Sequence, residues 1–275
     1  MRNTNDCTIV VSTCDAYRDL WPAFFALFKR YWPDCPYKIV LNTETLDFQW
    51  PGLEIEAFGF GENMTWGKRL RKTLKKIQTD QVLMLLDDFF LQAPVDTERL
   101  ENCMHWMQQN PEIANFSLFP DYFENIKDER FEDFELRKRV TAYVVNCQAG
   151  LWNRKELISL LRDHENAWQF EEFGTIRARY YKTHKKFYIL ANGAPLIFDY
   201  PVGGAIHRGK WRQDMPELLA QEHVEMDFSK RGFIEDDVLE QHILPDPEIK
   251  VPFAESWWGR KHDLSRYVKN WRSYF

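Results

Sequence analysis

The stretch VLMLLDDFFL, residues 82–91, places two adjacent aspartates, Asp87 and Asp88, directly after five consecutive apolar residues. An apolar run of this kind is typical of a strand buried on both faces, and the Phe-Phe-Leu that follows indicates that the core resumes beyond the charges. Ligands of open α/β sheets bind in the crevice outside the carboxyl ends of the strands. The stretch therefore predicts a central strand that ends at a binding site.

The segments around this stretch alternate between strand and helix patterns. We expect strands at residues 8–12, 37–42, 53–60, 82–86, 113–120, 140–152, 185–193 and within 194–211, and helices at 20–32, 64–78, 95–111 and, in two parts, 154–181. The strand at 140–152 is expected to run into a turn at Gly150, whereas residues 121–139 show no clear pattern. This order predicts an α/β fold with a mixed, mainly parallel central sheet flanked by helices.

Composition bounds the classes of function. The formal net charge of −6 argues against a protein that binds nucleic acid over its whole surface. No stretch approaches 18 uninterrupted apolar residues, and the first residues lack the pattern of a secretory signal, so we expect a cytoplasmic protein. Five cysteines without a CxxC pair favour neither a disulfide framework nor a zinc site. Aromatic residues make up 16% of the chain, which fits a large core or surfaces that stack sugars or bases.

The chemistry of the acidic pair points to a divalent cation. Mg²⁺ and Mn²⁺ prefer oxygen ligands, and Mg²⁺ is often held by one or two carboxylates together with substrate phosphates. Neighbouring side chains of an extended chain point to opposite faces, so we expect Asp88 as the metal ligand and Asp87 as its support or a nucleotide contact. In the alternative, Asp88 caps a turn and Asp87 pairs with the basic helix at residues 66–76.

Five motifs together resemble bacterial glycosyltransferases of the GT-A fold, of the kind found in surface-polysaccharide gene clusters. They are SxxDxYxDLW at residues 12–21, WGxxLxxxLxxI at 66–77, VLxLLDDFFL at 82–91, QxGLWxRxEL at 148–157 and WxFE at 168–171. The resemblance covers most of residues 7–211. Its most specific element is the acidic pair, the counterpart of the family's DxD motif, from which Leu-Asp-Asp-Phe departs in its literal spacing.

The resemblance implies a single GT-A-like domain over residues 1–275, with a nucleotide-binding half at about 1–120, an acceptor-side half at about 121–255 and a basic aromatic tail at 256–275. It also implies a hexosyltransferase-type enzyme that moves a sugar from a nucleotide-diphospho-sugar, with UDP as the expected nucleotide, to a glycan or lipid-linked acceptor. We expect inversion at the anomeric carbon and dependence on Mn²⁺ or Mg²⁺. The alternatives are a nucleotidyltransferase acting on sugar phosphates and a non-catalytic sugar-binding module.

The residues and the resemblance together select the expected site. For the donor and its nucleotide they select Ser12, Asp15, Tyr17, Lys68, Asp87, Gly150, Trp152, Arg208 and Lys210, and for the metal Asp88, Asp87 and His207. The catalytic base is expected at Glu171, with Glu172 beside it, because aromatic flanks desolvate a carboxylate and raise its pKa. Structural alternatives stay open: Asp15 as a turn residue, Lys68 on a solvated basic face, His207 as a structural histidine and both glutamates as solvent-facing helix residues.

The last segment, residues 259–275, interleaves basic residues with Trp, Tyr and Phe. This composition fits a peripheral contact with the inner face of the membrane, or a solvated terminal helix. We therefore expect a cytoplasmic protein that is free or peripheral at the inner membrane.

Overall fold

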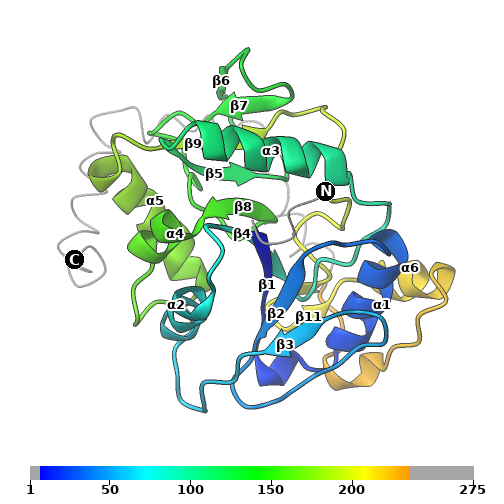
Figure 1. The fold of residues 1–275 in the computed structure, drawn as a ribbon. Coiled ribbons are helices and arrows are strands. Elements are labelled where there is room, and N and C mark those ends of the chain that lie inside the picture. Colours follow the sequence, from blue (N-terminus) through cyan, green and yellow to red (C-terminus); the bar gives the residue numbers. More distant parts are fainter. Residues whose placement is uncertain (1–6, 236–275) are drawn as a thin grey trace.

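A mixed β-sheet of nine strands runs through residues 7–235, the part of the chain described by this computed structural model (Figure 1). In spatial order the strands are β3 (Ile55–Ala57), β2 (Lys38–Asn42), β1 (Cys7–Ser12), β4 (Gln81–Leu86), β8 (Gly150–Asn153), β5 (Ile113–Ser117), β9 (Lys186–Leu190), β7 (Phe134–Leu136) and β6 (Ile126–Lys127). Within this sheet β8 and β7 run against the other strands, which share one direction. The prediction of a mixed, mainly parallel sheet is confirmed.

Helices cover both faces of the sheet (Figure 1). One hydrophobic cluster joins the sheet to α1 (Trp21–Tyr31), α3 (Thr97–Gln109) and α6 (Met215–Gln221). A second cluster joins it to α2 (Trp66–Lys76), α4 (Arg154–Leu160) and α5 (Ala167–Tyr181). The remaining elements are the short 3-10 helices η1 (Asp15–Tyr17) and η2 (Phe228–Lys230) and a small hairpin of β10 (Ile206–His207) and β11 (Lys210–Trp211).

Strand β1 shows why the central strands are apolar without alternation. Ile9 and Val11 pack into the cluster that contains α1, whereas Val10 between them packs into the cluster that contains α2. Strand β4 divides its apolar residues between the two faces in the same way. A strand covered by helices on both sides needs an apolar residue at every position, as the run at 82–86 predicts.

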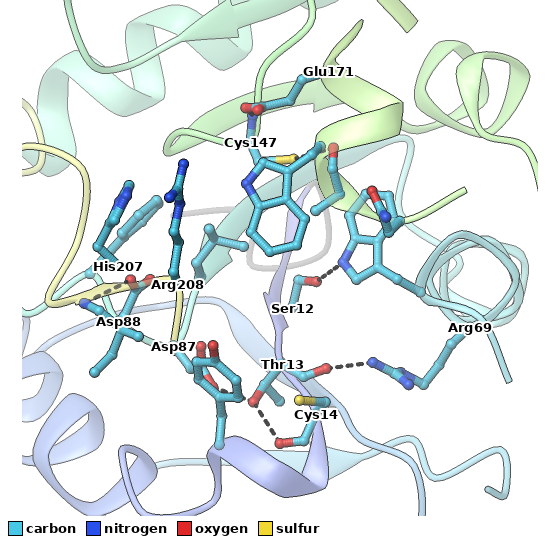
Figure 2. A pocket seen from close by; sticks show the side chains of 18 of the residues that line it. Ser12, Thr13, Cys14, Arg69, Asp87, Asp88, Cys147, Glu171, His207 and Arg208 are labelled. Carbon is cyan, nitrogen blue, oxygen red and sulfur yellow. Dashed lines mark hydrogen bonds between the residues drawn. The ribbon is translucent and has the colours of Figure 1, made fainter. Parts of the chain in front are cut away.

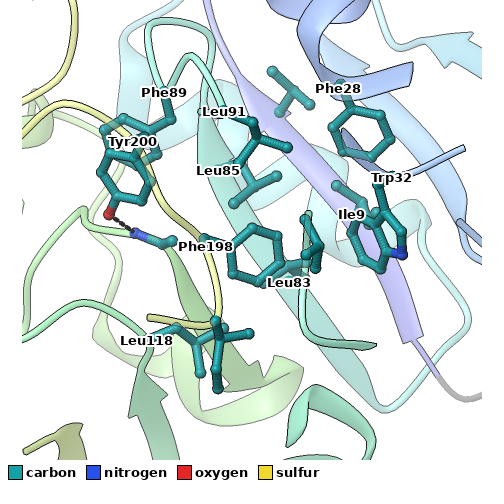
Figure 3. Packing of buried hydrophobic residues seen from close by; sticks show 14 of the residues in the cluster. Ile9, Phe28, Trp32, Leu83, Leu85, Phe89, Leu91, Leu118, Phe198 and Tyr200 are labelled. Carbon is teal, nitrogen blue, oxygen red and sulfur yellow. Dashed lines mark hydrogen bonds between the residues drawn. The ribbon is translucent and has the colours of Figure 1, made fainter. Parts of the chain in front are cut away.

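The core resumes immediately after the acidic pair, as predicted. Phe89, Phe90 and Leu91 are 3%, 0% and 4% exposed. The ring of Phe89 stacks on Tyr200 with 4.2 Å between ring centroids (Figure 3). The aspartates therefore stand in an interruption of the core that is two residues long.

The strand expected at 140–152 is wrong over most of its length. Residues 140–149 contain no strand, and β8 begins at Gly150, where a turn was expected. Val145 still fills the core, but its backbone pairs with a side chain of α5: Thr175 Oγ1 accepts from Val145 N at 3.0 Å and donates to Val145 O at 3.2 Å. Since a side chain satisfies these backbone groups, the apolar segment needs no strand partner.

Other boundaries also differ from expectation. The strand expected at 53–60 is limited to β3, the one expected within 194–211 is limited to the hairpin, and the unassigned residues 121–139 contain β6 and β7. No helix within residues 7–235 combines the length and apolarity needed to cross a bilayer. The basic tail at 256–275 lies outside the described residues.

Candidate functional site

A cavity of about 900 Å³ opens at the carboxyl ends of β1 and β4 (Figure 2). It is lined by Ser12, Thr13, Cys14, Tyr17, Glu44, Met64, Trp66, Arg69, Leu86, Asp87, Asp88, Phe89, Cys147, Gln148, Asn166, Ala167, Trp168, Glu171, Gly203, Ile206, His207 and Arg208. The register of the sheet creates this meeting point, because Ser12 and Leu86 are partners at the last position of two parallel strands. The residues that follow them, Thr13 and Asp87, therefore leave the sheet side by side.

Asp87 is held from the β1 side. Thr13 Oγ1 donates a hydrogen bond to Asp87 Oδ2, and Trp21 Nε1 in turn donates to Thr13 Oγ1 at 2.8 Å. Asp87 is 5% exposed. The chain of donors orients its carboxylate at the floor of the cavity.

Asp88 is held from the glycine-containing loop before β10. Its carbonyl oxygen accepts from Ala205 N at 2.9 Å, and its Oδ2 lies 3.4 Å from Ile206 N. Gly204, with a φ of +80°, passes so close that a Cβ there would stand 2.2 Å from Asp88 Oδ2. Glycine is therefore required at this position by backbone conformation and by the contact with the carboxylate.

The expectation that the two aspartates point to opposite faces is wrong. Strand β4 ends at Leu86, and Asp87 and Asp88 lie in the turn that follows, where both line the cavity. The alternative in which Asp87 pairs with the basic helix is also excluded, because neither aspartate forms an ion pair with a lysine or arginine in residues 7–235. Within residues 7–235 the two buried carboxylates thus face one space without an ion-pair partner.

Burial disfavours the charged forms of this pair, and repulsion by Asp88 adds to the effect on Asp87. Burial, with a smaller contribution from the neighbouring Asp88, raises the pKa of Asp87 well above its usual range. Burial raises the pKa of Asp88 to about 7. A bound cation would favour the charged forms and so lower the pKa of both carboxyl groups.

The hairpin β10–β11 brings His207 and Arg208 to the cavity wall. Its two turn residues, Arg208 and Gly209, have φ angles of +50° and +80°, the conformation of a two-residue type I′ turn. Arginine is an unusual choice there, since Asn or Gly adopts positive φ at lower cost. Within residues 7–235 no three His, Cys, Asp or Glu side chains gather as a metal site, so His207 does not complete one with the aspartates in this structure.

Glu171 lies at the opposite end of the cavity from Thr13, Cys14 and Asp87 (Figure 2). Its Oε1 accepts a hydrogen bond from Cys147 N at 2.7 Å. Burial raises the pKa of this carboxyl to about 7, against the smaller opposing effect of that hydrogen bond. Glu171 is thus a half-buried carboxylate positioned to exchange a proton near neutral pH. Glu172, the second candidate, does not line the cavity.

The structure divides the expected donor residues into two groups. Ser12, Tyr17, Asp87 and Arg208 line the cavity, and Ser12 Oγ accepts from Trp66 Nε1 at 2.9 Å. Asp15, Lys68, Gly150, Trp152 and Lys210 lie outside the lining. Asp15 acts as a turn residue: its carboxylate accepts from Glu44 N and Thr45 N, both at 3.0 Å, and so ties η1 to the loop after β2.

Gly150 and Trp152 belong to the core strand β8. Trp152 is 1% exposed and packs in the cluster that contains Val10, so it offers no face to a sugar ring. A Cβ at Gly150 would lie 3.0 Å from Trp152 Nε1, which explains the glycine by packing within the sheet. The expected sugar contact at Trp152 is therefore corrected to a role in the core.

The expected site did not include Arg69 and Glu44, which form an ion pair at the cavity wall. Arg69 is 3% exposed and also donates to Thr13 O at 2.7 Å, so it supports the loop at the end of β1. Two signals were available. Glu44 follows the strand next to β1 and so leaves the same edge of the sheet, and Arg69 lies three residues after Trp66 on the buried side of α2, unlike the exposed Lys68.

No protein-family model matches this chain, and no curated protein matches it.

Among solved structures the chain is similar to residues 1–349 of TarS from S. aureus, with a TM-score of 0.47, 10% identity, and coverage of 82% of this chain and 68% of that one. It is also similar to a mannosyltransferase from Pyrobaculum calidifontis, in complex with GDP-Man and Mn²⁺, with a TM-score of 0.35, 12% identity, and coverage of 55% and 45%. A third is the galactosyltransferase LgtC, in complex with donor and acceptor sugar analogs, with a TM-score of 0.36, 15% identity, and coverage of 55% and 59%. With every TM-score below 0.5, these likenesses are distant.

Proposed function

We propose that the protein is a glycosyltransferase that transfers a sugar from a nucleotide-diphospho-sugar to a hydroxyl group of a glycan or lipid-linked acceptor. The observation that carries this proposal is the pair of buried carboxylates, Asp87 and Asp88, that face a large cavity without an ion-pair partner in residues 7–235. Buried charges of one sign require a counter-charge, and a ligand that brings a divalent cation supplies it. The five sequence motifs support the same activity.

The donor set at this end of the cavity fits a divalent cation. Carboxylate oxygens are the ligands that Mg²⁺ and Mn²⁺ prefer, and a carboxylate pair with substrate phosphates is a common arrangement for Mg²⁺. Asp88 would hold the cation with Asp87 beside it, and His207, which lies next to Asp88, is an additional candidate (Figure 2). When bound, the cation supplies positive charge that offsets the charge developing on the departing diphosphate.

The remaining residues of this end suit a nucleotide. Arg208 brings a positive charge to the wall beside Asp88, as a diphosphate requires (Figure 2). Tyr17 presents an aromatic ring near Thr13 and Asp87, and Arg69 fixes the loop that carries Thr13. These contacts would bind the diphosphate and orient the nucleoside.

Glu171 would act as the general base. Its carboxylate accepts the proton of the acceptor hydroxyl while the hydroxyl oxygen forms a bond to the anomeric carbon and the bond from that carbon to the diphosphate breaks. The products are the glycosylated acceptor, a nucleoside diphosphate and a proton held on Glu171. A pKa of about 7 lets this group both accept and release the proton near neutral pH. A base on the acceptor side, across the cavity from the diphosphate end, favours inversion of the anomeric configuration.

The finer features rest on the sequence resemblance. We propose UDP as the nucleotide, surface polysaccharide as the product, and a cytoplasmic location with peripheral contact at the inner membrane. The domain halves proposed at about 1–120 and 121–255 each contribute residues to the one cavity, through the Asp87–Asp88 turn and through Glu171 and Arg208.

A thermal-shift screen of nucleotide sugars tests the proposal. We expect a UDP-sugar or another nucleotide sugar, at about 100 times its Kd with Mn²⁺, to stabilise the protein by about 2.7 kcal/mol and to raise its Tm by several degrees. The shift should disappear in Asp88→Asn and persist in Asp34→Asn, which changes an exposed aspartate outside the cavity. If no nucleotide sugar shifts the wild-type protein with or without Mn²⁺, the proposal is wrong.

A further inference from the structure

Trp168 is an exposed aromatic side chain at the cavity. It is 72% exposed, the largest value among the exposed large hydrophobic residues of the described chain, and it lines the cavity as the second residue of α5. A tryptophan left open to water exposes a large apolar surface that gains free energy when a ligand covers it. The exposed ring at this position therefore favours binding of a ligand with an apolar face.

A capping box fixes the backbone of the first turn of α5, which carries this ring. Asn166 and Gln169 form a capping box: Asn166 N donates to Gln169 Oε1 at 3.0 Å, and Gln169 N donates to Asn166 Oδ1 at 2.9 Å. Trp168 and Glu171 are three residues apart on this helix, so their side chains lie on the same face, and both line the cavity. A ligand stacked on Trp168 thus lies on the helix face that also carries Glu171.

The chemistry of this end of the cavity differs from that of the Asp87–Asp88 end. The described lining segments at 147–148 and 166–171 contain no lysine or arginine, whereas Asp87 and Asp88 line the other end. Their polar groups are the carboxamides of Gln148 and Asn166 and the carboxylate of Glu171. Such a set forms hydrogen bonds with hydroxyl groups but offers no counter-charge to a phosphate.

We propose that Trp168 is the stacking surface for a neutral pyranose ring of the acceptor. A pyranose combines an apolar face of C–H groups, which covers an indole, with a rim of hydroxyl groups, which the carboxamides and Glu171 can bind. Stacking there places one hydroxyl next to the proposed base. The inference rests on the proposed function, because it assigns the Glu171 side of the cavity to the acceptor, and it makes Trp168 a residue that determines acceptor specificity. A nucleobase stacked on the same ring is the competing outcome.

Binding of neutral methyl glycosides tests the inference. Methyl glycosides of glucose, galactose, mannose and N-acetylglucosamine are titrated into wild-type protein, Trp168→Ala, Trp168→Phe and Tyr122→Ala, with saturation-transfer NMR as the readout. Tyr122 is also exposed, at 60%, but lies outside the cavity lining, so its variant is the matched control. In parallel, UDP and GDP with Mn²⁺ are titrated into the same four proteins.

We expect at least one methyl glycoside to bind, with affinity about tenfold weaker in Trp168→Ala, largely retained in Trp168→Phe and unchanged in Tyr122→Ala. Nucleotide affinity should be the same in all four proteins. The inference is overturned if no methyl glycoside binds the wild-type protein, if Trp168→Ala binds it equally well, or if Trp168→Ala weakens nucleotide binding to the same extent. If a methyl glycoside binds but neither UDP nor GDP does, the proposed glycosyltransferase activity is wrong and Trp168 remains a saccharide-binding residue.

Discussion

Glu165 and Asp88 are both buried carboxylates, with 0% and 8% exposure, yet the protein treats them in opposite ways. Glu165 accepts from both terminal nitrogens of the buried Arg177, at 2.7 and 2.6 Å. Asp88 lies near backbone N–H groups and forms no ion pair within residues 7–235. Asp87 and Glu171 also form no ion pair among these residues. The scaffold neutralises its own buried charges, whereas the cavity leaves three carboxylates for whatever binds there.

The largest effect is expected from breaking the scaffold pair. Arg177→Met should lower the free energy of unfolding by about 3–5 kcal/mol, because it leaves Glu165 charged and buried. Arg71→Met is the matched control, since Arg71 pairs with Asp163 at the surface, where an ion pair contributes less than about 1 kcal/mol. Urea denaturation measures both. Equal effects of the two substitutions would contradict the distinction between scaffold and surface charges.

Glu171 tests the acid–base role of a cavity carboxylate. Glu171→Gln should lower kcat for sugar transfer by about 10²–10⁴-fold, since the amide cannot accept a proton. In the wild-type protein the rate should rise with pH through about 7 and then level off, because only the ionised carboxylate accepts the proton. The neighbour outside the cavity lining supplies the control: Glu172→Gln should keep both the rate and the pH profile. A wild-type rate independent of pH around 7 would remove Glu171 from the mechanism.

The raised pKa of Asp88 makes the free energy of unfolding of the metal-free protein depend on pH. Its pKa in the folded protein, about 7, lies above its ordinary value of 3.8, so the folded state binds the proton more tightly than the unfolded state does. Stability should therefore fall as pH rises from about 4 to about 7. Asp88→Asn should be about 4 kcal/mol more stable than wild type at pH 8 and about equally stable at pH 4. Chemical denaturation in EDTA measures the difference, and a constant offset at both pH values would contradict the assigned titration.

The smallest effect concerns the hairpin. Arg208→Asn should raise stability by about 0.5–1 kcal/mol, because asparagine adopts the positive φ of a type I′ turn more readily. It should also weaken nucleotide binding about tenfold through the lost charge. Arg208→Lys keeps the charge and the strained backbone, and should change both quantities less. If nucleotide affinity in Arg208→Asn equals that of wild type, Arg208 does not contact the donor.

Much of residues 1–120, the proposed nucleotide-binding half, could be predicted from the sequence, because its strands are apolar runs and its cavity-lining residues Ser12, Asp87 and Asp88 end or follow them. The run at 82–86 identifies β4, and the sheet rule then places Asp87 and Asp88 at its carboxyl end. The direction in which these side chains point could not be predicted, since it depends on the exact residue at which the strand ends.

The other half contains the larger errors, because its elements depend on contacts between distant segments. Trp152 and Trp168 look alike in the sequence, but β8 inserts antiparallel between β4 and β5, which buries the first, while α5 carries the second to the cavity. Val145 is not part of a strand, because Thr175, thirty residues later, forms the hydrogen bonds of its backbone N–H and C=O groups. Neither pairing leaves a local pattern.

The most direct test is the release of nucleoside diphosphate from a panel of UDP- and GDP-sugars by the purified protein, with Mn²⁺ and with EDTA, for wild type and Asp88→Asn. We expect release from at least one donor with Mn²⁺, loss of release in EDTA, and a decrease of about 10²–10³-fold in Asp88→Asn although the variant stays folded. No release from any donor, or equal release by wild type and Asp88→Asn, would contradict the assignment of the Asp87–Asp88 cavity as a nucleotide-sugar site.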